Sequence, residues 1–445
     1  MPDINETHVV DCLINPGWII PMIPGGKVLS DCSVAIHEGR IAAILPEREA
    51  RRRFHGAEEY QLPSCALMPG LVNTHGHGAM SLLRGLADDL PLHTWLNDHI
   101  WPTEGRWVSE EFVRDGTELA IAEMLLTGTT LFSDMYFFPD QVVAAARRAG
   151  IKAQVAFPIL EFPTAWARDA EEYIHKGLAL YDDLRNDAQI SIAFGPHAPY
   201  TVADKTFQKI VSLAGELDAA IHIHLHETAD EVETALAREG HRPLDKLLNF
   251  GALGPQTQCA HMTQISGSDL EALQRTGAHV LHCPHSNMKL ASGFCPTQDL
   301  LNAGVNVALG TDGAASNNGL SLFSAMSLAS LIAKGQTGDP SALDAPQSLA
   351  MATINGARAL DREAETGSIE IGKAADLIAV DLSALHSQPL YNPLSQLVYT
   401  DCSRQVSHVW VNGRLLVAEG KLLTLDHDQL IDKARYWQRK ISSDE

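Results

Sequence analysis

The strongest constraint on the fold is an alternation from about residue 66 to 370, in which short apolar runs are separated by longer helical patterns. This rhythm is typical of a parallel sheet whose strands are connected by helices. Eight such strands predict a (β/α)₈ barrel, an α/β fold. The predicted strands are residues 66–75, 129–135, 152–157, 191–197, 220–225, 257–261, 279–282 and 305–311.

Polar side chains gather where these predicted strands end, which is where a barrel of this kind carries its chemistry. Side chains alternate faces along a strand, so His75 and His77 point the same way and Gly76 leaves room between them. Taken alone, a His-x-His pair is equally compatible with two solvent histidines beside a Gly-rich turn. The other polar strand-end residues are Asp134, His197, His224, His261, His282 and Asp312.

Both ends of the chain are β-rich and differ from the middle. Strand-like runs alternate with turns over residues 8–46, and the same texture returns at 375–381 and 406–417. Neither end has enough strands to bury a sheet alone. We therefore expect residues 1–65 and 370–445 to form one small β-sandwich beside a barrel of residues 66–369, with a surface helix over 426–440.

Composition narrows the class of partner. Asp and Glu number 55 against 33 Lys and Arg, for a formal charge of −22, which disfavours nucleic acid and anionic membranes because phosphate binding needs clustered basic residues. Seven scattered cysteines without a Cys-x-x-Cys pair indicate reduced thiols, and no leader pattern or apolar run of 18 residues occurs. We expect a cytoplasmic protein with a small-molecule ligand, and a homo-oligomer that could assemble through exposed helices such as 320–333.

Metal binding is the chemistry that the strand-end histidines favour. The fifth strand offers His222, His224 and His226 on one face, and alternation alone does not choose among them. Asp312 lies where strand eight meets a Gly-rich loop and is placed as an oxygen ligand, although without the histidines an N-cap or Asx-turn role would be favoured. His-x-His, one further His and an Asp suit Zn²⁺, Fe²⁺, Co²⁺ or Mn²⁺ with a position left for water.

The donor set predicts a hydrolytic reaction at a single metal ion. A divalent ion lowers the pKa of its water to roughly 7 in favourable zinc sites. Glu227, three residues beyond His224, could carry the water's proton to a leaving group, although a lone Glu here would more often be a helix N-terminal residue. The end of strand four, around His197, has no lysine to bridge a second metal. Together with His261, the set suits attack on an sp² ring carbon that bears an amine, which is hydrolytic deamination.

Motifs that carry a family resemblance lie at these strand ends. They are Pro69-Gly-Leu-Val-Asn-Thr-His75-Gly-His77, Gly195-Pro-His197-Ala-Pro-Tyr200, His224-Leu-His-Glu227-Thr, Cys259-Ala-His261, Ser286-Asn287-Met-Lys289-Leu and Gly310-Thr-Asp312-Gly-Ala-Ala-Ser316-Asn317-Asn318. Together they resemble the amidohydrolase superfamily, in particular its 5′-methylthioadenosine/S-adenosylhomocysteine deaminase branch, across nearly the whole chain. In the family's His-x-x-Glu motif the first residue binds metal, which implies that His224 is a ligand and Glu227 moves protons. The other implied roles are ligation of one ion, Zn²⁺ before Fe²⁺ or Mn²⁺, by His75, His77 and Asp312, and positioning of the attacking hydroxide by His261.

The same resemblance implies contacts to a substrate. The stretch from Trp95 to Glu104 is similar to the family's nucleoside loop, in which the Glu104 carboxylate accepts hydrogen bonds from both ribose hydroxyls. Without the resemblance, this stretch would be interpreted as an amphipathic helix with buried tryptophans. The other implied contacts are His197 and Ser316 to the ribose or purine, and Trp95 and Phe137 over the apolar 5′ side.

Two departures from the family pattern bear on the substrate. His282-Cys283-Pro284-His285 stands where the family commonly has His-Asn-Pro, which alters local hydrogen bonding. S-Adenosylhomocysteine needs a partner for its carboxylate, and residues 160–184 offer only Arg168, at a shifted spacing. We therefore expect 5′-methylthioadenosine or adenosine, converted to the inosine analogue and ammonia, before S-adenosylhomocysteine. The alternatives are a deaminase or chlorohydrolase of a free base or s-triazine, and a non-catalytic barrel scaffold.

Overall fold

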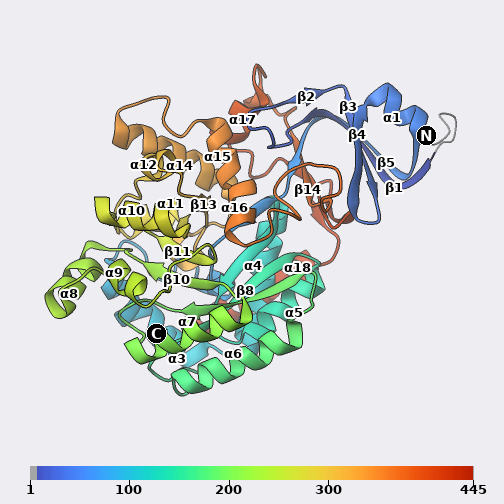
Figure 1. Ribbon diagram of the computed structural model, residues 1–445. Helices are drawn as coiled ribbons and strands as arrows, with labels where there is room; N and C mark the ends of the chain where they lie inside the picture. The colour runs from blue at the N-terminus through green and yellow to red at the C-terminus, as the bar shows by residue number, and fades with distance from the viewer. Residues whose placement is uncertain (1–7, 444–445) are drawn as a thin grey trace.

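The computed structural model describes residues 8–443 and consists of a barrel beside a mixed sheet (Figure 1). Neighbouring barrel strands are parallel and follow one another in chain order, which confirms the predicted (β/α)₈ architecture. The barrel strands are β6 (Leu71–Asn73), β7 (Thr129–Met135), β8 (Lys152–Ile159), β9 (Ile190–Pro196), β10 (Ile221–Leu225), β11 (Thr257–His261), β12 (His279–His282) and β13 (Val307–Leu309).

The first and last barrel strands meet just beyond their carboxyl ends. The backbone N–H of Thr74 donates to the carbonyl of Leu309 at 3.0 Å, and the N–H of Asp312 donates to the carbonyl of His75 at the same distance. These bonds join the segment after β6 to the segment after β13. The backbone that carries His75 and Asp312 is therefore fixed by the closure of the barrel itself.

Strand β10 illustrates why the barrel forms from this sequence. Ile221, Ile223 and Leu225 belong to the large apolar core shared with the surrounding helices. The alternate residues His222 and His224 point to the other face, where their rings lie against that of His75. Because β10 is buried on both faces, its polar side chains need hydrogen-bond partners inside the barrel. His222 pairs with His75, and His224 pairs with the carbonyl of His197.

Helices surround the barrel and close its amino-terminal end. Ala357 of α16 (Ile354–Ala359) and Leu360, which follows that helix, pack against Val72 and Leu131, so the interior opens at the opposite end. The helices are η1 (Gly78–Leu83), α2 (Leu92–Thr94), η2 (Trp95–Ile100), α3 (Trp101–Trp107) and α4 (Glu110–Leu126) before β7; α5 (Pro139–Ala149), α6 (Ala170–Leu184) and α7 (Asp204–Leu217) after β7, β8 and β9; α8 (Ala229–Glu239) and α9 (Pro243–Asn249) after β10; α10 (Gly267–Thr276) after β11; α11 (Pro284–Lys289) and α12 (Thr297–Asn302) after β12; and α13 (Ala314–Asn317), α14 (Leu322–Thr337), α15 (Ala345–Met351) and α16 (Ile354–Ala359) after β13.

The two ends of the chain share one mixed sheet, as predicted. Its strand order is β17-β16-β15-β14-β5-β1-β3-β4, with β2 paired to β1, and its own core combines residues from both ends, such as Ile14, Val34, Leu377 and Trp410. The strands are β1 (His8–Ile19), β2 (Leu29–Ser30), β3 (Cys32–His37), β4 (Arg40–Pro46), β5 (Phe54–Pro69), β14 (Leu377–Asp381), β15 (Val406–Val411), β16 (Arg414–Ala418) and β17 (Lys421–Leu422), with the helices α1 (Glu47–Arg53), η3 (Leu385–Ser387) and α17 (Pro393–Tyr399).

The strand predicted over residues 66–75 is two strands in different sheets. β5 stays in the mixed sheet as far as Pro69, which pairs with Leu377 of β14, and the barrel begins at Leu71. The chain crosses between the sheets at Gly70, whose backbone packs so closely that an added Cβ would lie 2.0 Å from Oγ1 of Thr130. The apolar run hides this change of sheet because both strands are buried.

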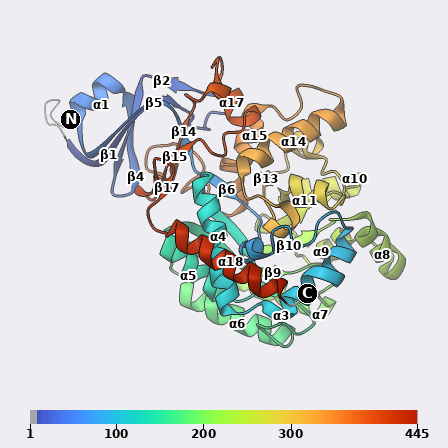
Figure 2. The ribbon, with the colours of Figure 1, turned by 180° about the vertical axis from the view of Figure 1, so that it is seen from behind.

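The last helix, α18 (His427–Ser442), lies along α4 of the barrel (Figure 2). Its Trp437 is buried and donates from Nε1 to Asp115 Oδ2 at 3.1 Å. The helix expected to be exposed over 320–333 is instead largely buried as α14, although Leu331 remains exposed. Among residues 8–443, no helix combines the length and apolar character that crossing a membrane requires.

Candidate metal centre and substrate pocket

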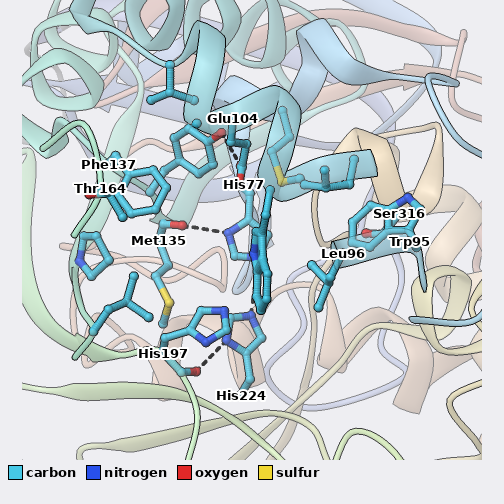
Figure 3. A pocket seen from close by; sticks show the side chains of 18 of the residues that line it. His77, Trp95, Leu96, Glu104, Met135, Phe137, Thr164, His197, His224 and Ser316 are labelled. Carbon is cyan, nitrogen blue, oxygen red and sulfur yellow. Dashed lines mark hydrogen bonds between the residues drawn. The ribbon is translucent and has the colours of Figure 1, made fainter. Parts of the chain in front are cut away.

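Four donor atoms converge where β6, β10 and β13 end. Asp312 Oδ1 lies 3.2 Å from Nε2 of His77 and 3.5 Å from Nε2 of His75. Nε2 of His224 lies 3.3 Å from Nε2 of His77, and Figure 3 shows these two rings facing one another in the pocket. The structure thus brings together the three histidines and the aspartate that the sequence singled out.

Each of the three imidazoles is held through its other ring nitrogen. This arrangement fixes the orientation of the ring and leaves Nε2 directed at the point of convergence. The holding contacts, all of 2.7 Å, are His75 Nδ1 to His222 Nε2, His77 Nδ1 to the carbonyl of Met135, and His224 Nδ1 to the carbonyl of His197.

The donor set fits a bound metal ion. Nε2 of His75 is buried without a hydrogen-bond partner among the described residues, and a buried polar atom of this kind calls for a ligand. In a tetrahedral site with bonds of about 2.0–2.2 Å, neighbouring donor atoms lie roughly 3.3–3.6 Å apart. The separations at Asp312 and between His77 and His224 lie close to this range.

The electrostatics of the cluster also favour a cation. Burial lowers the pKa of His75 to about 4. Burial also lowers the pKa of His77, but the adjacent Asp312 carboxylate outweighs it and raises that pKa to about 9. The two histidines in turn hold the pKa of Asp312 well below its usual range despite its burial. The ionised carboxylate therefore draws positive charge to the point where the nitrogen donors meet.

Glu227 and His261 lie beside this cluster. Glu227 follows β10, lines the pocket and has its Oε2 3.9 Å from Nε2 of His261. Nδ1 of His261 is paired with Oδ1 of Asn287 at 2.8 Å, so its Nε2 faces the centre. Burial raises the pKa of the Glu227 carboxyl group, which makes it a group able to gain and lose a proton.

Three of the strand-end residues adopt left-handed backbone conformations. The φ angles are 52° at His226, 73° at His261 and 62° at Asp312. This region is unfavourable for residues with a Cβ, and such residues cluster at functional sites where the surrounding structure holds them. The strained backbone conformations are therefore found at the ends of β10, β11 and β13, where the candidate site lies.

A pocket of about 290 Å³ opens above the donor cluster. Glu104 is half-buried in its wall and accepts a hydrogen bond of 2.5 Å from the Tyr136 hydroxyl (Figure 3). Burial raises the pKa of Glu104 to about 7, although the bond from Tyr136 lowers it. The predicted site residues that line this pocket are His77, Trp95, Glu104, Phe137, His197, His224, Glu227, His261, Asp312 and Ser316.

The structure separates the remaining candidates from the pocket. The Arg168 side chain is 83% exposed and pairs with Glu172, and it is not among the residues that line the pocket in the described part of the chain. His222 supports His75 and bonds on its other side to Gln258 Oε1 at 2.9 Å. The other two histidines have local partners: His226 Nε2 accepts from the backbone N–H of Leu244 at 3.1 Å, and His285 Nε2 lies 3.0 Å from Ser324 Oγ.

Several residues that shape the site were not predicted to do so. Tyr136, which donates to Glu104, is the residue after β7, so the strand-end rule could have found it. Asn287 was visible within the Ser-Asn motif, but nothing in the sequence pairs it with His261. Ser316, expected to contact substrate, donates to Asp312 Oδ2 at 2.8 Å.

Comparison with known proteins gives consistent matches along the chain. The amidohydrolase family model matches residues 66–416. A protein of Teredinibacter turnerae named 5-methylthioadenosine/S-adenosylhomocysteine deaminase is 51% identical, with 99% of this chain and all of the relative covered. A protein of the same name from Saccharophagus degradans is 53% identical over 97% of each chain.

A solved structure agrees with these sequence matches. The crystal structure of an adenosine deaminase from Xanthomonas campestris with bound zinc superposes with a TM-score of 0.97 at 47% identity, covering 98% of this chain and 100% of that one. The family match covers most of the chain, and the curated relatives cover nearly all of it. The chain belongs to the amidohydrolase family and is a hydrolase that acts on carbon–nitrogen bonds.

Proposed function

We propose that the protein is a metal-dependent hydrolytic deaminase of adenine nucleosides, which converts 5′-methylthioadenosine or adenosine to the inosine analogue and ammonia. The observation that carries the proposal is the convergence of four donor atoms beside Glu227 in a pocket that is also lined by the half-buried Glu104. The printed names of the Teredinibacter and Xanthomonas proteins support the same reaction.

His75, His77, His224 and Asp312 are the proposed ligands of one metal ion, and Zn²⁺ is the proposed metal. Three imidazole nitrogens and one carboxylate oxygen suit zinc, and the Xanthomonas structure contains it. When bound, the ion would lower the pKa of a water molecule to roughly 7.

Glu227 is the proposed proton carrier. Its raised pKa suits a group that both accepts and releases protons. It takes one proton from the water and delivers it to ring nitrogen N1, and it carries the second proton to the departing amine, while the water oxygen becomes the carbonyl oxygen at C6. His261, which faces Glu227, is the proposed hydrogen-bond partner of the attacking oxygen.

Glu104 is the proposed contact to the ribose, because one carboxylate accepts hydrogen bonds from both hydroxyls of a vicinal diol. His197, Ser316, Trp95 and Phe137 are proposed to complete the nucleoside pocket. Within residues 8–443, no lysine or arginine lines this pocket. The carboxylate of S-adenosylhomocysteine therefore has no cationic partner there, which ranks this compound below 5′-methylthioadenosine and adenosine.

An ammonia-release screen tests the substrate assignment. The metal-replete protein is assayed with adenosine, 5′-methylthioadenosine, S-adenosylhomocysteine, guanine, cytosine and an s-triazine. We expect the first two to have the highest kcat/KM. Turnover of a free base or triazine above the nucleosides would instead support the alternative activity, and no turnover together with no stoichiometric metal would support a scaffold.

Replacement of Glu227 tests the proposed chemistry. Glu227→Gln should bind metal normally and lose deamination by several orders of magnitude, since proton transfer alone contributes roughly 10²–10⁴-fold. Glu233→Gln, an exposed acid on the adjacent helix α8, is the matched control and should keep its activity. Near-normal turnover by Glu227→Gln would disprove the proton-carrier role.

Location and assembly are also proposed. All seven cysteines are free thiols and six are buried, which suits the reducing cytoplasm. Leu331 of α14 and Tyr399 of α17 are exposed apolar side chains on neighbouring helices, and a second copy of the chain is the proposed occupant of this face. Light scattering coupled to size-exclusion chromatography measures the oligomeric state.

A further inference from the structure

The backbone turn that presents Glu227 is held by an unusual carboxylate contact. Glu231, on the first turn of α8, reaches back past the start of its helix and accepts two backbone hydrogen bonds. Its Oε1 accepts from the N–H of His226 at 3.0 Å, and its Oε2 accepts from the N–H of Glu227 at 2.8 Å. Both oxygens of one half-buried side chain are thus used on two consecutive amides.

This geometry differs from an ordinary helix cap. The sequence Thr228-Ala-Asp-Glu231 has the pattern of a capping box, in which the glutamate would bond the backbone N–H of the N-cap residue, Thr228. The threonine does its part, because its Oγ1 accepts from the N–H of Glu231 at 3.2 Å. The Glu231 carboxylate bonds instead to the amides one and two residues before the N-cap. Its position therefore serves the turn after β10 more directly than the helix.

The turn needs such support because its backbone is strained. His226 has a φ of 52°, a conformation that costs of order 1–3 kcal/mol for residues other than glycine. The opposite side of the turn is held by Thr263, whose backbone N–H donates to the carbonyl of His226 at 2.9 Å and whose hydroxyl donates to the carbonyl of Glu227 at 2.7 Å. Glu231 and Thr263 therefore hydrogen-bond to the same two residues, Glu231 at their amide groups and Thr263 at their carbonyl groups.

Burial of the Glu231 carboxyl group has a cost that helix capping alone does not require. Burial raises its pKa to about 7, although the two amide bonds lower it. An exposed side chain could cap the helix without this penalty. The buried position is the one from which both amides can be reached.

We infer that Glu231 is a positioning residue for the reaction, which holds the His226–Glu227 turn so that the Glu227 carboxylate is aimed at the metal centre. The inference rests on the proton-carrier role proposed above for Glu227. Without the two backbone hydrogen bonds that Glu231 accepts, the strained turn relaxes and the Glu227 carboxylate moves away from the reacting atoms. Substrate binding is unaffected, because the groups proposed to hold the ribose lie on other segments.

The test is a double-mutant cycle between Glu231 and Glu227 in the metal-loaded enzyme. Glu231→Ala should lower kcat by roughly 10- to 100-fold, as misplacement of a catalytic group by about 1 Å does, with KM within about twofold of the wild type. Glu231→Gln, which keeps the size of the side chain and one accepting oxygen, should fall in between. Metal content should stay stoichiometric in both, and Glu233→Ala on the exposed side of α8 should match the wild type.

The cycle separates positioning from a general structural role. If Glu231 acts through Glu227, adding Glu231→Ala to the Glu227→Gln variant should change the residual rate by less than about twofold, because groups that act as a unit are not additive. The same fold-loss in both backgrounds, or wild-type kcat in both Glu231 variants while Glu227→Gln is inactive, would overturn the inference alone. A fully active Glu227→Gln variant would instead remove the proposed role of Glu227, and the inference with it.

Discussion

Glu104 presents a half-buried carboxyl group at the place where a ribose is proposed to bind. Its ionised form offers one accepting oxygen to each hydroxyl of a diol, whereas in its neutral form one of the two oxygens carries a proton and acts as a donor. Burial raises its pKa from the usual 4.5 to about 7, so the neutral form dominates below that pH and the ionised form above it. Binding of a diol should therefore strengthen as the pH rises through about 7.

A comparison of ribo- and deoxyribonucleosides measures this effect. The KM for adenosine should fall by roughly tenfold between about pH 6 and pH 8, in proportion to the ionised fraction of Glu104. Deoxyadenosine lacks the 2′-hydroxyl and so has no diol, and its KM should change less. Glu104→Gln should raise the KM for adenosine by roughly 10- to 100-fold, the loss expected for charge-assisted hydrogen bonds, and should abolish its pH dependence. Equal changes for both substrates would contradict the ribose assignment.

The residues of the site could be predicted from the sequence only where a local pattern carried them. Period-two alternation put His222 and His224 on one face but gave no depth along the strand, and the structure separates them, with His222 behind His75 and His224 in the pocket. The family resemblance implies that His224 is the ligand, and His224 is the one of these two that lines the pocket. Arg168, expected as a partner for a substrate carboxylate, instead lies just before α6 with an exposed side chain that pairs with Glu172.

At the scale of elements, a buried ion pair connects the barrel to the mixed sheet. Lys152, the first residue of β8, places its Nζ 2.7 Å from Asp376 Oδ2, just before β14, and 2.8 Å from Glu365 Oε1. Lys152 and Asp376 are both buried. Removing one partner of such a pair leaves an uncompensated buried charge, which is strongly destabilising.

Lys152→Met should therefore lower the free energy of unfolding by about 3–5 kcal/mol, while kcat at room temperature stays near that of the wild type because the change lies at the end of the barrel opposite the pocket. Thermal or denaturant unfolding measures the loss. Lys209→Met is the matched control, since it breaks an exposed pair with Glu171 and should cost less than about 1 kcal/mol. Equal free energies of unfolding for the two variants would show that the buried ion pair does not stabilise the contact between the barrel and the mixed sheet.

Most elements follow from periodicity, and the exceptions have physical causes. Strands such as β7, β11 and β12 match their predicted bounds because each is a short apolar run between turn signals. The change of sheet at Gly70 was invisible because the residues on both sides are buried and extended. The contact of Glu231 with the amides of His226 and Glu227 was equally hidden, because Thr228-x-x-Glu231 predicts an ordinary capping box.

At the scale of the whole molecule, the proposed metal ligands connect distant parts of the barrel. His75 and His77 follow the first strand, His224 lies on the fifth and Asp312 follows the last. A ligand that binds only the folded state stabilises it by mass action. A metal ion at this point therefore stabilises the closed ring of strands as well as supplying the chemistry.

Removal of the metal should reduce activity and stability together. Dialysis against a chelator should abolish ammonia release and lower the melting temperature, and Zn²⁺ should restore both. At a free metal concentration of about 100 times the Kd, binding stabilises the folded state by about 2.7 kcal/mol. Asp312→Asn should lose most of the metal-dependent shift in melting temperature, whereas Asp299→Asn, at an exposed position on α12, should retain it. Full activity with no stoichiometric metal by elemental analysis would contradict the proposed centre.

The closure of the barrel at Thr74 and Asp312 also has a consequence for biosynthesis. As the chain leaves the ribosome, the imidazole donors emerge first, and the one carboxylate among the four emerges last, on the segment that joins the final strand to the first. A nascent chain that has not yet reached residue 312 offers nitrogen donors without the negative charge that draws a cation to them. Under the ligand set proposed above, the four donor groups are therefore complete only once the final strand has joined the first.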